Sequence, residues 1–404
     1  MNEKKNWRTP AVVIACGGLA MTIVLGTRHG FGLYLQPMTL DLGISREVFS
    51  FAIALQNLFY GFSQPLTGMI ADKYGAARVM AAGTIAYAIG LVLMAHSSTG
   101  MELNLSAGLL IGTAMGCCGF STVYGVIGRV VPAEKRSTAM GIVGAAGSMG
   151  QFLMLPYGQL LINHMGWQQA LLILAITVLL LLPLSAALVE DKKTQARHLF
   201  KQSIPAALRE AFSHRGFILM SIAYTVCGFQ LLFVSVHFPA YLIDQKMTPA
   251  TGMIALALIG LFNTFGSYTW GWLGGRHSKK YLLATLYFTR ALVVMAFVMN
   301  PLSETSVYLF SSAIGFLWLG TAPITSALIA QIFGVRYLST LSGCAFMFHQ
   351  FGSFLGVWLG GRIFDSTGSY TLMWWITIIA GFVAALLVLP VNERQIPRNA
   401  TAAA

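Results

Sequence analysis

The chain has 404 residues, of which 56% are hydrophobic and only 9% charged, and its mean hydropathy is +0.71. Soluble domains carry about 25% charged residues, so this composition excludes an ordinary water-facing surface. Lipid is the alternative solvent, and the formal net charge of +12 must be explained in that setting.

Apolar segments of about 20 residues span a bilayer as helices, and the chain consists almost entirely of such segments. The pattern predicts an all-α membrane protein with twelve transmembrane helices. We place the spans at 11–37, 45–71, 76–96, 103–130, 137–163, 167–189, 216–243, 249–275, 281–299, 305–331, 337–363 and 369–390. A polar stretch separates the sixth span from the seventh. It divides the chain into an N-terminal six-helix bundle (1–189), a cytoplasmic inter-bundle loop (190–215) and a C-terminal six-helix bundle (216–404).

Most lysines and arginines fall in loops on one side of this topology, the side that holds both termini. The other side has only Arg46, Lys246 and Arg362. Positively charged loops stay in the cytoplasm, so the pattern predicts cytoplasmic termini in a multi-pass membrane protein. The net charge is thus a topology signal and gives no reason to expect a nucleic-acid partner.

The five cysteines (Cys16, Cys117, Cys118, Cys227 and Cys344) lie inside apolar runs and show neither disulfide nor metal-ligand spacing. The sequence contains no GxxxxGK[ST] phosphate-binding loop, so an ion or solute gradient is the expected driving force. The spans hold no carboxylate pair and no nucleophile–base set, so no enzyme activity, metal or cofactor is predicted.

An internal repeat relates the two halves of the chain. A shift of 202 residues superposes residues 141–152 on 343–354, so that Gly150 meets Gly352. Small residues allow helices to approach closely, and related halves with a site between them are a transporter architecture.

Between spans two and three the chain reads GMIADKYGAARV (68–79), which resembles the GxxxD[RK]xGxx[RK] signature of the major facilitator superfamily. The resemblance implies the major facilitator fold. It also implies that this loop gates the inward face, with Asp72 paired to basic residues such as Arg78 or Arg136 when that face is closed. The gating residues implied in this way are Gly68, Asp72, Lys73, Gly75, Arg78 and Arg136.

Within that superfamily, KRSTAMGIVGAAGSMG (135–150) is similar to the span-five signature of monocarboxylate porters and oxalate/formate exchangers. The resemblance implies a small monocarboxylate or related organic anion as the substrate. Animal monocarboxylate porters place an Asp and an Arg in span eight. Here that span reads GLFNTFGSYTWGW (260–272), and Asn263 and Ser267 are its nearest polar substitutes.

Only two charged side chains, Arg28 and Arg290, lie inside spans, whereas all 13 acidic residues lie in loops or at helix ends. Burying a cation at mid-bilayer costs about 3 kcal/mol or more. A guanidinium can hold a carboxylate through two parallel hydrogen bonds, so the asymmetry predicts an anionic substrate. Arg28 either binds that substrate or extends to the outer interface. Arg290 is either a ligand or a structural partner of backbone carbonyls or of Asn300.

Two histidines are the candidate proton carriers, because imidazole titrates near physiological pH. His349 lies in the middle of span eleven, and His237 lies toward the outer end of span seven. A buried histidine is also commonly a neutral packing residue. Two further options stay open: the substrate itself carries the proton, or the protein exchanges anions without protons.

The other candidate substrate-binding side chains are aromatic residues and amides, which can fix a small ligand by directed hydrogen bonds. Each is also explained by contacts between helices. They are Tyr34, Gln56, Asn57, Tyr60, Tyr124, Asn263 and Trp318.

The sequence therefore predicts a monomeric secondary transporter that moves a small organic anion by alternating access, either coupled to protons or as an exchanger. One alternative is proton-driven multidrug efflux, which calls for an intramembrane acid that the spans lack. A second alternative is a solute sensor that does not transport and reports through the 190–215 loop.

Overall fold

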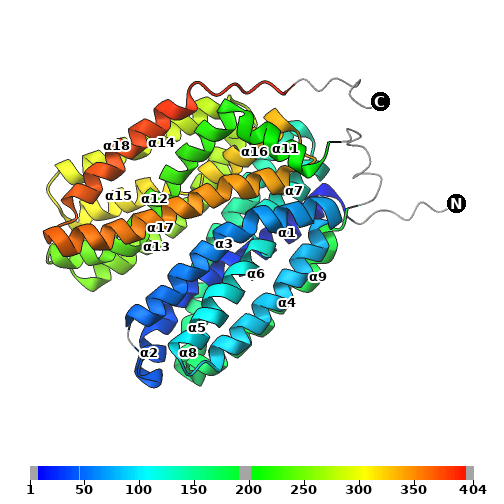
Figure 1. The fold of residues 1–404 in the computed structure, drawn as a ribbon. Coiled ribbons are helices and arrows are strands. Elements are labelled where there is room, and N and C mark those ends of the chain that lie inside the picture. Colours follow the sequence, from blue (N-terminus) through cyan, green and yellow to red (C-terminus); the bar gives the residue numbers. More distant parts are fainter. Residues whose placement is uncertain (1–7, 45, 191–201, 397–404) are drawn as a thin grey trace.

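The computed structural model describes residues 8–44, 46–190 and 202–396, and within these ranges every regular element is helical (Figure 1). Lipid offers the backbone no hydrogen-bond partners, and a helix satisfies its backbone groups internally. The N-terminal half contains α1 (Pro10–Gly30), η1 (Phe31–Tyr34), α2 (Leu35–Leu42), α3 (Arg46–Tyr74), α4 (Ala76–Ala95), α5 (Gly100–Leu103), the π-helix η2 (Asn104–Ile111), α6 (Gly112–Cys118), α7 (Phe120–Val130), α8 (Ala133–Leu179), α9 (Leu181–Ser185) and η3 (Ala186–Leu188). The C-terminal half contains α11 (Ile204–Ser213), α12 (Arg215–Asp244), α13 (Pro249–Gly274), α14 (Lys279–Met299), α15 (Glu304–Phe316), α16 (Thr321–Phe333), α17 (Leu338–Thr367) and α18 (Thr371–Val388).

The predicted all-α membrane fold is confirmed. In the described chain, nine segments are long and apolar enough to cross a membrane. One of them, 133–188, holds two crossings, because Gly166 (φ 80°, ψ 166°) breaks the helix in a conformation that favours glycine. Together with α3 (29 residues) and α17 (30 residues), these segments account for the twelve predicted spans.

The outer surface of the bundles suits lipid. Ile85, Ile89 and Leu93 lie four residues apart on α4 and are 48%, 50% and 50% exposed. Residues at this spacing share one helix face. A continuous apolar stripe on an exposed face is costly in water and favourable against acyl chains.

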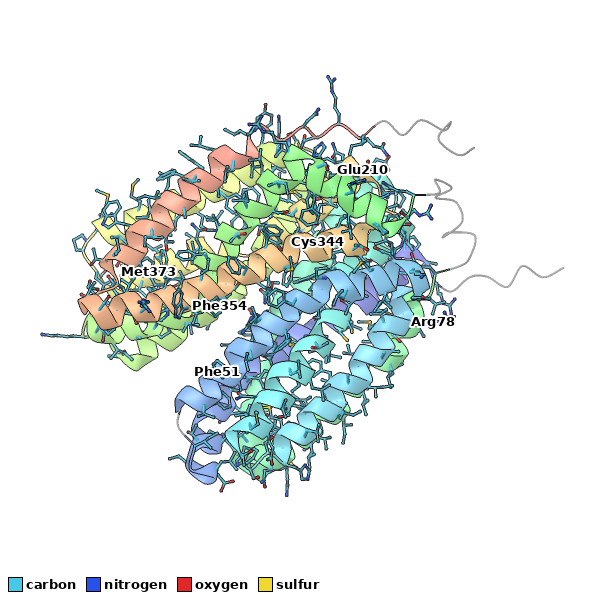
Figure 2. All side chains as sticks on the ribbon, viewed as in Figure 1. Phe51, Arg78, Glu210, Cys344, Phe354 and Met373 are labelled. Carbon is cyan, nitrogen blue, oxygen red and sulfur yellow. The ribbon has the colours of Figure 1, made fainter. Side chains whose placement is uncertain are left out.

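The helices gather in two bundles, α1–α9 and α12–α18 (Figure 1). The bundles meet at the end where α1 begins and α18 ends, which we call the termini side, and diverge toward the opposite side. Figure 2 places Arg78 and Glu210 on the termini side, whereas Phe51 of α3 and Phe354 of α17 lie along the diverging halves. Of the loop predicted at 190–215, residues 191–201 lie outside the described residues, and α11 occupies much of the remainder.

The internal repeat reappears as equivalent helix contacts in the two bundles. A Cβ atom on Gly150 of α8 would lie 2.2 Å from the carbonyl oxygen of Thr22 on α1. A Cβ atom on Gly352 of α17 would lie 1.9 Å from the carbonyl oxygen of Thr225 on α12. In both halves, glycine lets the fifth span of the bundle touch the backbone of the first, as expected for a pseudo-symmetric pair.

Replacing Gly352 with Ala is expected to lower the thermal stability of the purified protein, because the new Cβ would meet backbone rather than a movable side chain. Overpacking of this kind costs about 1–3 kcal/mol or more. The matched control is Gly30→Ala on α1, where nothing lies within 4 Å of the added Cβ. Thermal unfolding in detergent should separate the two variants, and equal melting temperatures would contradict the packing argument.

Two spans expected as continuous helices are interrupted. Span four is broken at Gly119, whose extended backbone (φ −80°, ψ −177°) separates α6 from α7. Span ten is broken at 317–320, between α15 and α16. The shift of 202 residues carries Gly119 onto Thr321, the first residue after the break in span ten, so the two breaks lie at nearly the same place in their bundles. Interrupted helices inside a membrane expose backbone groups that neighbouring side chains must satisfy.

Candidate functional site

Arg28 lies in the last turn of α1 and is the centre of a group that we call the cation site (Arg28, Asn57 and Tyr60). Its Nη2 donates a hydrogen bond to Oδ1 of Asn57, and its guanidinium carbon lies 5.2 Å from the ring centroid of Tyr60. The amide of Asn57 is fixed because its Nδ2 donates to the carbonyl oxygen of Ile53 at 2.9 Å. Within the described chain, no carboxylate pairs with Arg28. This half-buried cation therefore has neutral partners and lacks an anionic one.

The cation site faces the C-terminal bundle through α17. Nε2 of Gln350 donates to the carbonyl oxygen of Asn57 at 3.3 Å, and the ring of Phe346 lies edge-on to Tyr60 at a centroid distance of 5.1 Å. Phe346 in turn stacks on His349 at 5.3 Å. Oη of Tyr60 and Nε2 of His349 are both buried and have no hydrogen-bond partner among the described residues. Buried polar atoms are normally hydrogen-bonded, so these two atoms call for an explanation.

The break in span four lies beside the same site. Oε1 of Gln64 accepts a hydrogen bond from the hydroxyl of Ser121, just after the break. A Cβ atom on Gly119 would lie 2.4 Å from Nε2 of Gln64 and 2.9 Å from Oη of Tyr60. Only glycine leaves room for these two polar atoms at the point where the helix opens.

Arg290 is fully buried in the C-terminal bundle at the break in span ten. Its Nη2 donates to the carbonyl oxygen of Leu317 and, at 2.8 Å, to that of Trp318. Its Nη1 lies 3.3 Å from both Sγ of Cys227 and Oε1 of Gln230. The guanidinium thus supplies donors to carbonyls of an interrupted helix. These contacts match the structural role considered for Arg290, and its ligand role stays a prediction.

Asn263 holds the same break from α13. Its Oδ1 accepts hydrogen bonds from the backbone N–H of Leu319 at 3.1 Å and from the hydroxyl of Ser267 at 3.2 Å. The side chain is fully buried, and its Nδ2 has no partner among the described residues. Two predicted substrate-binding residues, Asn263 and Trp318, therefore meet at the break in span ten.

Three other predicted residues lie within the N-terminal bundle. The hydroxyl of Tyr124 donates to the carbonyl oxygen of Met140 at 3.0 Å, and Nε2 of Gln56 donates to that of Ala107 at 2.9 Å. Tyr34 is fully buried, and its hydroxyl has no partner in the described part of the chain. The contacts of Tyr124 and Gln56 join neighbouring helices, which is the structural alternative for such residues.

His237 lies apart from His349, toward the opposite side of the C-terminal bundle. Its Nδ1 is 3.2 Å from the hydroxyl of Tyr370, and its Nε2 is 2.9 Å from the carbonyl oxygen of Val357. With Arg362 it lines an open cavity of about 740 Å³. Both ring nitrogens of His237 therefore have hydrogen-bond partners. Nε2 of His349, in contrast, has none among the described residues.

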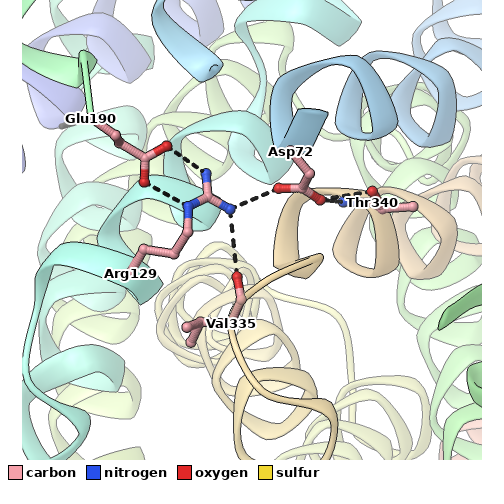
Figure 3. A network of polar contacts seen from close by, with 5 residues as sticks. All are labelled: Asp72, Arg129, Glu190, Val335 and Thr340. Carbon is pink, nitrogen blue, oxygen red and sulfur yellow. Dashed lines mark hydrogen bonds and ion pairs between the residues drawn. The ribbon is translucent and has the colours of Figure 1, made fainter. Parts of the chain in front are cut away.

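The termini side is closed by an ion network (Figure 3). Arg129 pairs with Asp72 at 2.7 Å and with Glu190 at 2.6 Å, and the side chains of all three are at most 4% exposed. Oδ2 of Asp72 accepts hydrogen bonds from the backbone N–H and the hydroxyl of Thr340, each at 2.7 Å, and Nη1 of Arg129 contacts the carbonyl oxygen of Val335 at 3.5 Å. The network joins the two bundles, because Thr340 lies in the first turn of α17, where a carboxylate complements the helix dipole.

The partners expected for Asp72 were wrong. Arg78 and Arg136 donate to nearby backbone carbonyls at 3.4 Å and 3.1 Å, and in this closed state the cation beside Asp72 is Arg129. The reason lies in the helix ends. Arg129 is in the last turn of α7, close to the end of α3, whereas Arg78 extends outward from the start of α4.

Two glycines of the predicted gating loop, residues 68–79, have clear structural roles. A Cβ atom on Gly68 would lie 2.5 Å from the carbonyl oxygen of Ser339, so α3 and α17 touch through their backbones. Gly75 has a positive φ of 99° and connects α3 to α4 in a conformation that favours glycine. Lys73 is exposed and packs against the ring of Tyr74 at 5.1 Å.

The sequence did not assign several side chains that make these contacts. The internal repeat could have pointed to one of them, Gln230, because the shift of 202 residues carries Arg28 onto it, and Gln230 contacts Arg290. The others are fixed by tertiary contacts without a local pattern. The unassigned residues are Gln64, Arg129, Glu190, Cys227, Gln230, Thr340, Phe346 and Gln350.

Twelve spans in two related bundles, with polar groups at their contact, form the architecture of secondary transporters. The chain matches the Major Facilitator Superfamily over residues 11–343 and belongs to this family. It is therefore a multi-pass membrane transporter and not an enzyme.

Relatives and solved structures agree with this assignment. The chain is 26% identical over 387 residues to the MFS-type transporter YcxA of Bacillus subtilis, covering 91% of this chain and 92% of that protein. It is 24% identical over 368 residues to monocarboxylate transporter 13 of Bos taurus, and the match covers 89% of this chain and 84% of that protein. The E. coli fucose:proton symporter FucP has the same fold, with a TM-score of 0.72 at 14% identity over 94% of this chain and 97% of that one. The proton:xylose symporter XylE has a TM-score of 0.73 at 14% identity, and the match covers 96% of this chain and 97% of that one.

Proposed function

We propose that this transporter carries a small monocarboxylate or related organic anion by alternating access. The observation that carries the proposal is the cation site. Arg28 is half-buried beside the contact between the bundles, and within the described chain its partners are an amide and an aromatic ring. A carboxylate would supply the missing negative charge through charge-assisted hydrogen bonds. The similarity to monocarboxylate transporters supports the same class of cargo.

We further propose that the termini side faces the cytoplasm of a bacterial inner membrane. The basic loops, including Lys73, Arg78 and Arg336, favour this orientation by the positive-inside rule. The closed ion network then seals the cytoplasmic side, and the diverging halves face outward. The N-terminal bundle (1–189) and the C-terminal bundle (216–404) would move as units around the 190–215 segment, in a monomer.

In the proposed cycle, the anion enters from the outer side and binds the guanidinium of Arg28 in competition with Asn57. Asn57 accepts a hydrogen bond from Gln350 of the other bundle, so displacement of Asn57 by the anion would alter a contact between the bundles. Closure of the outer side and release of Asp72 from Thr340 would then expose the anion to the cytoplasm. The equilibrium between the two states shifts only by the difference in affinity of the anion for them.

Small carboxylates are expected to raise the melting temperature of the purified protein. A ligand that binds only the native state stabilises it by about 2.7 kcal/mol at a hundredfold excess over Kd. A screen of short-chain mono- and dicarboxylates against amines and neutral sugars measures this directly. Stabilisation by hydrophobic amines alone would favour the drug-efflux alternative and contradict the proposal.

Counterflow in proteoliposomes then separates a carrier from a sensor. A carrier loaded with unlabelled carboxylate accumulates labelled carboxylate transiently. A sensor binds the same compound without accumulation.

A further inference from the structure

Arg290 carries a charge that needs a counterion. It is fully buried, and neither ion pair of the described chain includes it. Its side-chain partners are Gln230, which is neutral, and Cys227, whose Sγ lies 3.3 Å from Nη1. A thiol becomes an anion on losing its proton, and a nearby guanidinium favours that form. Cys227 is thus the acid in contact with this cation.

Two further groups lie beside the same thiol. The hydroxyl of Thr321, just after the break in span ten, lies 3.2 Å from Sγ of Cys227. His349, whose side chain is 4% exposed, packs against the same stretch of α12, because a Cβ atom on Gly228, the neighbour of Cys227, would meet the carbonyl oxygen of His349. A thiolate would therefore have a guanidinium and a hydroxyl in contact with it, as a buried anion requires, and His349 packs beside it.

The hydrogen bonds of His349 leave one ring nitrogen open. Nε2 of Gln350 donates to the carbonyl oxygen of Asn57, so Oε1 is the side of the amide that faces Nδ1 of His349 at 3.1 Å. An amide oxygen only accepts, which assigns the ring hydrogen of neutral His349 to Nδ1. Nε2 then holds a lone pair and has no partner among the described groups. It is a ready acceptor for a proton.

Among the described residues, the remaining ionisable groups in ring or cation contact with the cluster are phenols. Tyr224 of α12 lies 4.7 Å from His349 between ring centroids, and Tyr287 of α14 lies 5.7 Å from the Arg290 guanidinium. Tyr60 of α3 reaches His349 through Phe346. Phenols stay neutral at physiological pH. The charge of the cluster is therefore set by Arg290, Cys227 and His349.

We propose that Cys227 and His349 together form the proton-binding site of this transporter, with Arg290 as the fixed counterion. This inference rests on the proposed function and makes the carrier an anion–proton symporter. With Cys227 as thiolate and His349 neutral, the cluster has no net charge. A proton from the outer side binds either Sγ or Nε2 of His349, and the cluster gains one positive charge. Binding of a carboxylate compensates that charge, and both leave together on the other side.

A chain of contacts connects this cluster to the cation site. His349 contacts Gln350, Gln350 contacts the backbone of Asn57, and Asn57 accepts a hydrogen bond from Arg28. The chain crosses from one bundle to the other. Protonation can thus bias the position of Asn57, which competes with the anion for Arg28.

A titration of the purified protein tests the thiolate without any transport measurement. The ultraviolet absorption of the wild type minus that of Cys227→Ser is expected to show one thiolate at neutral pH, which disappears on acidification. Arg290→Gln should remove that signal. Cys344→Ser is the matched control, because Cys344 is also buried, on α17, and has no contact with a cation among the described residues. Its difference spectrum should stay flat. A difference spectrum without a thiolate band for Cys227 across the whole range would overturn the proposal.

Accumulation in proteoliposomes tests the coupling. For a one-to-one symporter, an inward gradient of one pH unit raises the accumulation ratio of the anion about tenfold. We expect this gain in the wild type and in Cys344→Ser, its loss in Cys227→Ser, and its recovery in Cys227→Asp, which restores an acid. Full pH-driven accumulation by Cys227→Ser would refute the proton site. Absence of carboxylate counterflow in the wild type would instead refute the proposed function, and the titration would still decide the thiolate.

Discussion

Arg28→Ala is expected to reduce carboxylate uptake by about 30-fold or more, because losing a charge-assisted contact costs about 2–5 kcal/mol and 1.4 kcal/mol is a factor of ten in affinity. The fold should survive the change. The side chain is half-buried, and its partner Asn57 keeps a second hydrogen bond to Ile53. The measurement is initial uptake in proteoliposomes at equal amounts of folded protein, combined with the melting-temperature response to the same carboxylate.

Two variants sharpen this experiment. Arg28→Lys keeps the charge but loses the planar pair of donors, so an intermediate loss of uptake is expected. Arg362→Ala is the matched control, because Arg362 is an exposed arginine stacked on Trp358 toward the opposite side, 5.6 Å from its ring centroid. Uptake by Arg28→Ala at the level of Arg362→Ala would remove the cation site from the mechanism.

Much of the fold could be predicted from the sequence, because hydropathy alone dictates where a helix must satisfy its own backbone. The third span was expected at 76–96 and is observed at Ala76–Ala95. The repeat of 202 residues also predicted that Gly150 and Gly352 occupy equivalent positions, and both contact the backbone of a neighbouring helix. Patterns of this kind are local or periodic, so a single sequence reveals them.

The helix breaks could not be predicted in the same way. Residues 103–130 and 305–331 are apolar throughout, and hydropathy does not distinguish a continuous helix from an interrupted one. Thr67 donates a hydrogen bond to the carbonyl oxygen of Gly116 beside the break at Gly119, and Arg290 donates to carbonyl oxygens of the break at 317–320. Both side chains come from other spans. Such interruptions are stable only where side chains of the folded bundle replace the missing backbone partners.

The candidate site was also predictable only in part: the sequence identifies the two arginines inside the spans but not their surroundings. The two intramembrane arginines attract attention because an unpaired cation in lipid is costly. Their surroundings differ, however, in a way that depends on helix rotation. Arg28 reaches Asn57 of α3 and stays half-buried, whereas Arg290 is enclosed by carbonyls, an amide and a thiol. One guanidinium is thus placed to receive an anion, and the other holds the helix break.

Asp72→Ala is expected to open the termini side. The carboxylate accepts two hydrogen bonds from Thr340 across the bundles, and charge-assisted hydrogen bonds contribute about 1.5–3 kcal/mol each. Losing both should shift the equilibrium toward the state open on this side by about 100-fold, since 1.4 kcal/mol is a factor of ten. Arg129 would keep Glu190 as its partner, so the N-terminal bundle itself should remain folded.

The shift can be measured as a distance between the bundles. Spin labels on genetically encoded ketone residues at Arg78 and His277, which are both exposed, report the separation of the termini side without using cysteines. Lys73→Ala is the matched control, because Lys73 neighbours Asp72 and is exposed. We expect a longer distance in Asp72→Ala and the wild-type distance in Lys73→Ala. The same short distance in both variants would show that closure of this side depends on the backbone contacts of α3 with α17, at Gly68 and Ser339, rather than on the ion network.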